Sequence, residues 1–100
     1  MTGVQTCALP IYYRKGLIFT AKGRPEDAAE QYKKSLEVDD NSALVHYLLA
    51  NILVKQGKIE EATAHYRQGL EIAGAKGAKN LAEDIQRQLE AIEKQKTENR

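Results

Sequence analysis

An internal repeat with an offset of 34 residues is the feature that most limits what this chain of 100 residues can fold into. The matched pairs keep one register over more than twenty positions. They are Tyr13 and Tyr47, Ile18 and Ile52, Gly23 and Gly57, Ala28 and Ala62, Tyr32 and Tyr66, Leu36 and Leu70, and Val38 and Ile72. A fixed period of this length is typical of arrays in which each unit buries its apolar face against its neighbours. The chain is therefore expected to contain two copies of one structural unit.

Each copy has the pattern of a helical hairpin. Apolar residues from Leu44 to Leu53 recur at spacings of three and four, which is typical of a helix with a wide apolar surface, here buried on two sides. Gly57 can adopt a positive φ and so end that helix, and a second apolar stripe starts at Ile59. Ala62 is small where two helices must approach closely. We expect an all-α fold with helices over residues 12–22, 25–38, 42–56, 59–72 and 78–94.

Both copies resemble the tetratricopeptide repeat (TPR), whose pattern is W-x2-L-G-x2-Y, then A-x3-F, then P. The first copy reads Tyr12-x2-Lys15-Gly16-x2-Phe19, then Ala28-x3-Tyr32, and the second His46-x2-Leu49-Ala50-x2-Leu53, then Ala62-x3-Tyr66. The chain departs from the pattern at Lys15, which replaces leucine, and at Asp40 and Gly74, which replace the closing proline. The resemblance implies a TPR-like α-solenoid fragment made of antiparallel hairpins, with about five helices.

Besides residues 1–11, the chain divides into three segments by these patterns. Residues 12–41 and 42–76 are expected to be TPR-like repeats 1 and 2, and residues 73–77 to form a loop. In residues 77–100, a single apolar stripe of Leu81, Ile85, Leu89 and Ile92 precedes a polar tail that should fray. We interpret this segment as a C-terminal capping helix that covers the end of the solenoid. A short coiled coil is the alternative, but the stripe is shorter than the three to four heptads that it would require.

Residues 1–11 are interpreted as a non-native segment. They resemble the translation of a common short-read sequencing adapter, a hypothesis that the encoding DNA would test. The alternative is a genuine N-terminal extension or weak signal peptide, although the segment lacks a basic n-region and a sustained apolar run. Cys7, the only cysteine, lies in this segment and gives no basis for disulfide or thiol chemistry. On this interpretation, sequence that belongs upstream of residue 12 is missing.

Charge and composition narrow the classes of partner. Fifteen basic and fourteen acidic residues nearly cancel and interleave along the helices, so no basic stripe is available for nucleic acid. No apolar run approaches the roughly 20 residues that span a bilayer. We therefore expect neither nucleic-acid binding nor membrane insertion by this chain. The sequence contains no feature that identifies a compartment.

No residue pattern indicates catalysis, a metal site or a cofactor. His46 and His65 are expected on different helices, with no acid, serine or cysteine at a useful spacing, so each is interpreted as packed or solvated. Asp39 and Asp40 are adjacent, but without further ligands we favour helix capping by Asp40, Asn41 or Ser42 over cation binding. The chain is therefore predicted not to be an enzyme by itself.

The resemblance implies recognition of a protein or peptide, because the first helices of TPR repeats line a concave groove that holds an extended peptide or a partner helix. The candidate groove residues are Tyr13, Leu17, Thr20, Leu44, Tyr47, Leu48, Asn51 and Lys55. Asn51 stands out because an amide can both donate to and accept from a ligand backbone. The alternative is that Tyr13 and Tyr47 only pack between repeats and that Asn51 is solvated.

Two further expectations concern what lies outside the repeats. The apolar N-terminal face of the first repeat has no covering helix in this sequence and could self-associate. The chain could also be the C-terminal accessory TPR region of a larger enzyme, for example a transferase or a membrane-anchored processing protein, with its catalytic domain upstream.

Overall fold

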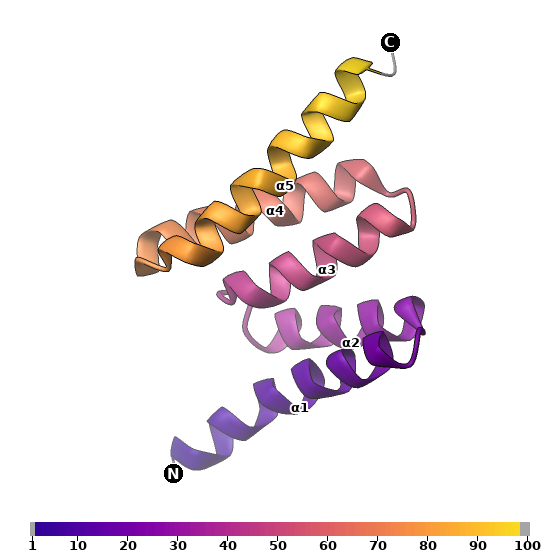
Figure 1. Ribbon diagram of the computed structural model, residues 1–100. Helices are drawn as coiled ribbons and strands as arrows, with labels where there is room; N and C mark the ends of the chain where they lie inside the picture. Colours follow the sequence, from indigo (N-terminus) through magenta and orange to yellow (C-terminus); the bar gives the residue numbers. More distant parts are fainter. Residues whose placement is uncertain (1, 99–100) are drawn as a thin grey trace.

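The computed structural model describes residues 2–98, including the side chains of residues 11–96. Five helices form over the described residues, with no strand: α1 (Thr2–Ala21), α2 (Pro25–Val38), α3 (Ala43–Lys55), α4 (Ile59–Lys76) and α5 (Lys79–Glu98). Figure 1 shows them stacked in chain order, with the two ends of the chain at opposite ends of the stack. The molecule measures 53 × 31 × 19 Å, the elongated shape of a short solenoid. The expected all-α, TPR-like fold is confirmed.

Three helices end in the same way, which explains the positions of the turns. Gly23, Gly57 and Gly77 follow or lie just beyond the last turns of α1, α3 and α4 and have φ values of 74°, 82° and 73°. In each case the next backbone N–H donates to the carbonyl five residues earlier: Arg24 to Phe19, Lys58 to Leu53 and Ala78 to Ala73, all at 2.9 Å. This is a Schellman motif, in which glycine supplies the left-handed conformation at low cost.

The helix starts also follow local chemistry. Pro25 occupies the first turn of α2, where its missing N–H is not needed. Of the three capping candidates before α3, Ser42 caps the helix: its hydroxyl accepts from the Val45 N–H at 3.3 Å.

Small residues allow the paired helices to approach closely. Ala28 and Ala62 are fully buried in the core, as is Ala50 on α3. At Gly16 on α1, an added Cβ would lie 2.7 Å from Cδ1 and 2.8 Å from Cζ of Tyr32, so the α1–α2 hairpin has no room for a side chain there. The 34-residue register therefore describes the packing of both hairpins.

The expected loop over residues 73–77 is wrong. Helix α4 continues four residues past Ile72 to Lys76, and the chain turns only at Gly77 and Ala78. Ala73 is 0% exposed and alanine is the strongest helix former, so the helix gains both burial and backbone hydrogen bonds by continuing. Gly74 is helical, and Gly77 is the glycine that adopts positive φ.

The boundaries of the outer helices also differ from expectation. Helix α1 begins at Thr2 instead of residue 12, because extending a helix that is already formed avoids the cost of nucleating a new one. Helix α5 runs to Glu98, past the expected end near residue 94. It packs against α4 and α3, and its stripe buries Ile85 and Ile92. The side chain of Cys7 and residues 99–100 of the expected frayed tail lie outside the described residues.

The structure also bears on membrane insertion. Over residues 2–98, none of the helices combines the length and the apolar character required to cross a bilayer.

Candidate functional site

The eight candidate residues lie on α1 and α3, the first helices of the two hairpins, and we refer to them as the first-helix surface. They are Tyr13, Leu17 and Thr20 on α1, and Leu44, Tyr47, Leu48, Asn51 and Lys55 on α3. Leu17 and Leu44 are each 39% exposed, and Lys55 is exposed. Tyr13, Tyr47, Leu48 and Asn51 are half-buried. The surface thus offers apolar, aromatic, amide and cationic groups, and its use by a single ligand stays a prediction.

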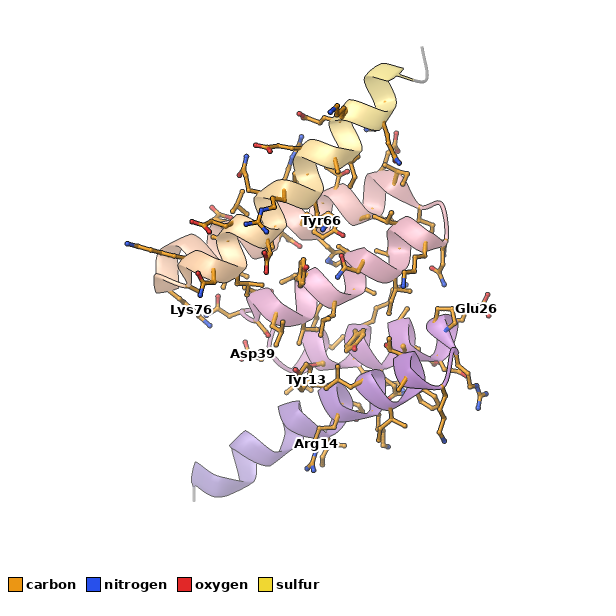
Figure 2. The ribbon with its side chains drawn as sticks, in the orientation of Figure 1. Tyr13, Arg14, Glu26, Asp39, Tyr66 and Lys76 are labelled. Atoms are coloured by element: carbon orange, nitrogen blue, oxygen red, sulfur yellow. The ribbon has the colours of Figure 1, made fainter. Side chains whose placement is uncertain are left out.

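Tyr66 of α4 joins two of these residues. Its hydroxyl donates a hydrogen bond to Asn51 Oδ1, and its ring lies 6.1 Å from the ring of Tyr47 at an angle of 51°. Figure 2 shows Tyr66 between α3 and α4. Asn51 is therefore not simply solvated: one side of its amide is held by a buried phenol. Its Nδ2 group has no hydrogen-bond partner among the described residues.

The surroundings of Tyr66 favour its neutral form. Burial raises the pKa of Tyr66 to about 12, and the neighbouring Tyr47 adds to the rise. Because an uncharged phenol is the donor to Asn51, the hydrogen bond is present throughout the physiological pH range.

The first hairpin lacks the equivalent hydrogen bond. Tyr32 is the counterpart of Tyr66, but Leu17 stands where the second repeat has Asn51, and Tyr32 Oη is buried without a hydrogen-bond partner. Burial raises the pKa of Tyr32, and the nearby Thr20 hydroxyl partly offsets this rise, although it does not form a hydrogen bond with Tyr32 Oη. The Thr20 hydroxyl donates instead to the Gly16 carbonyl at 2.8 Å. The two halves of the first-helix surface therefore differ in polarity.

The two histidines meet, which the sequence-based interpretation missed. His46 Nδ1 lies 3.0 Å from His65 Nδ1, and His46 Nε2 lies 2.9 Å from the Asp40 carbonyl oxygen. His46 is 4% exposed, so of the two states expected for it, packed or solvated, it is packed, and its partner is another titratable ring. The hairpin itself carries a signal for this contact, because His46 and His65 stand nearly the same number of residues before and after the turn at Gln56.

The connection between the repeats is held by hydrogen bonds. Asp39 Oδ1 accepts from the Asn41 N–H at 3.0 Å, and Lys76 Nζ donates to the Asn41 carbonyl at 2.7 Å.

Among the described residues, no three His, Cys, Asp or Glu side chains gather as a metal site would require.

The N-terminal face of α1 is more exposed than its counterpart. Ile18 is 52% exposed, whereas Ile52, its equivalent on α3, is 6% exposed because α2 packs against α3. Self-association through this face stays a prediction.

Comparisons with known proteins agree with this geometry. A profile of the TPR repeat matches residues 16–57, and a profile of the tetratricopeptide repeat matches residues 43–75. No curated protein sequence matches significantly. Among solved structures, PcrH in complex with the chaperone binding region of PopD is similar, with a TM-score of 0.83 and 21% identity. The match covers 88% of this chain and 67% of that chain. At this identity the likeness concerns the fold.

Proposed function

Because the chain belongs to the tetratricopeptide-repeat family, we propose that it is a protein-interaction module that binds an extended peptide or a partner helix on its first-helix surface. The observation that carries the proposal is the state of Asn51. Tyr66 holds the amide oxygen, and this fixes the orientation of an Nδ2 group that has no partner among the described residues. A polar group that is already oriented binds a ligand with a smaller loss of side-chain entropy.

The neighbours of Asn51 suit a peptide. Tyr47 and Lys55 lie four residues before and after Asn51, so the three side chains are neighbours along one side of α3. Tyr47 supplies amphipathic contact area, Asn51 Nδ2 can donate to a backbone carbonyl, and Lys55 can meet a carboxylate. Leu17 and Leu44 add exposed apolar area for side chains of the ligand.

The similar solved structure supports an interaction role without identifying a ligand. In that structure PcrH is seen with the chaperone binding region of PopD, and PcrH shares the fold of this chain. The class of partner proposed here is accordingly a protein segment, with no catalytic role proposed for residues 12–94.

The test separates ligand binding by Asn51 from its structural bond to Tyr66. Asn51→Asp keeps an oxygen that can accept from the Tyr66 hydroxyl but removes the Nδ2 donor, whereas Asn51→Ala removes both. We expect Asn51→Ala to weaken peptide binding and also to lower the free energy of unfolding by about 1 to 3 kcal/mol, because a buried hydroxyl loses its partner. Asn51→Asp should weaken binding with a smaller loss of stability.

Binding is measured by titrating a peptide library against the full-length protein, with urea unfolding of each variant alongside. Gln68→Ala is the matched control, since Gln68 is an exposed amide residue on α4, outside the first-helix surface. It should bind like the wild type. If Asn51→Asp binds every hit with wild-type affinity, Asn51 Nδ2 is not a ligand donor and the proposal fails at this residue.

A further inference from the structure

The contact between His46 and His65 lies outside the first-helix surface and has no part in the proposed function. His46 is on α3 and His65 on α4, and their Nδ1 atoms are 3.0 Å apart. The other ring nitrogen of His46 is 2.9 Å from the backbone oxygen of Asp40, in the connection between the repeats. A nearly buried ring thus links three parts of the chain: the repeat connection, α3 and α4.

The partners fix the tautomers of both rings. A carbonyl oxygen can only accept, so His46 Nε2 must carry a proton and donate it to Asp40. Neutral His46 then has a lone pair on Nδ1, and the 3.0 Å contact requires His65 Nδ1 to carry the proton that bridges them. The Nε2 atom of His65 is left free to accept one more proton.

This arrangement can accept one added proton but not two. The first can go to His65 Nε2, and His65 then still donates from Nδ1 to His46. A second proton could bind His46 only at Nδ1, where it would face the N–H of His65. Two donors and two positive charges would then meet at a distance that now holds a hydrogen bond, and the contact must break.

We propose that the His46–His65 pair is a pH-sensitive latch, which holds α4 to α3 and to the repeat connection near neutral pH and opens when both rings are protonated.

The groups around His65 determine whether the fold gains or loses stability as the pH falls. Burial lowers the pKa of His65, and His46 on α3 and Lys33 on α2 lower it further, while Glu61 on α4 opposes them. Helix α5 also packs against α4 but supplies none of the charges that act on His65 among the described residues. A histidine whose pKa is lowered by folding contributes to stability at pH values above its ordinary pKa of about 6.5. This contribution is lost as the pH falls from there through the lowered pKa.

The latch lies beside a close approach of α4 to the start of α3. Gly69, one turn beyond His65, has no side chain: a Cβ there would lie 3.3 Å from the Ala43 carbonyl oxygen and 3.4 Å from His46 Cβ. Lys76 binds the same connection from the end of α4. Opening the latch should therefore loosen the contact between α4 and the joint that orients repeat 2 on repeat 1.

The variant that tests the latch is His65→Asn. The amide nitrogen of asparagine takes nearly the place of His Nδ1 and can donate to neutral His46. When His46 is protonated, the amide can turn and present its oxygen instead. The variant should therefore keep the contact in both states. We expect the urea midpoint of the wild-type chain to fall between pH 7.5 and pH 5.5, and that of His65→Asn to fall clearly less.

Imidazole ¹⁵N spectra of the wild-type chain test the geometry without a substitution. At pH 8 they should show His46 protonated at Nε2 and His65 protonated at Nδ1, with the His65 titration midpoint below that of a model histidine peptide. Equal falls in urea midpoint for the two proteins would overturn the proposal. So would spectra in which His65 Nδ1 carries no proton at pH 8, and these decide the matter if His65→Asn does not fold.

Discussion

Tyr66→Phe and Tyr32→Phe make a matched pair of substitutions, because the two residues occupy the same position in successive repeats. Each tyrosine is 1% exposed, and each belongs to the second helix of its hairpin. The Tyr66 hydroxyl donates to Asn51 Oδ1, whereas the Tyr32 hydroxyl is buried without a partner. Phenylalanine removes the hydroxyl from the same kind of site in both cases and leaves the ring in place.

The two substitutions should act in opposite directions. Tyr66→Phe loses a hydrogen bond whose net contribution is about 1 kcal/mol, and it leaves the half-exposed Asn51 to bond with solvent. Tyr32→Phe removes a polar group that was stripped of water without compensation, a state that costs about 1 to 3 kcal/mol. We expect Tyr66→Phe to lower the free energy of unfolding by about 1 kcal/mol. Tyr32→Phe should leave it unchanged or raise it by about the same amount.

Urea unfolding followed by circular dichroism measures both changes, provided that the dependence on urea is the same for all variants. A change of about 1 kcal/mol should also move the melting temperature by roughly 4 to 8 °C in a domain of this size. Combining Tyr66→Phe with Asn51→Ala should cost no more than Asn51→Ala alone, because Asn51→Ala leaves the Tyr66 hydroxyl buried without a partner, as in Tyr32, and Tyr66→Phe removes it. If the two phenylalanine variants lose equal stability, the hydroxyls of Tyr66 and Tyr32 contribute equally even though one faces Asn51 and the other faces Leu17. That result would refute the reasoning.

Two other predictions follow from the packing and from the pKa of Tyr66. Ala62→Leu should lower the free energy of unfolding by about 1 to 3 kcal/mol, because Ala62 is fully buried between α3 and α4. A change below about 0.5 kcal/mol in urea unfolding would show that Ala62 does not lie in that interface. In a spectrophotometric titration, Tyr66 should ionise at about 12, so its contribution to stability is present below pH 10 and is lost as the pH rises toward 12; the step at about 12 should disappear in Tyr66→Phe.

The sequence by itself determined the hairpins and their register. Helix α2 begins and ends at the predicted residues, and the glycines at positions 23 and 57 end α1 and α3 as expected. Ala28 and Ala62 are buried where the repeat required small residues. These features depend on interactions between residues close in sequence and on an apolar period that repeats, so one chain carries enough information to predict them.

The tertiary structure alone decided where α4 ends and which polar groups meet. A glycine-rich segment predicts a loop after Ile72, but burial of Ala73 in the tertiary structure favours four more helical residues. The bond from Tyr66 to Asn51 and the contact between His46 and His65 join helices across a hairpin, and each depends on how far one helix is rotated and shifted against the other. A shift of one residue along α4 would direct either side chain elsewhere. Periodicity fixes which face of a helix is buried, but only the packed pair fixes which atoms on that face touch.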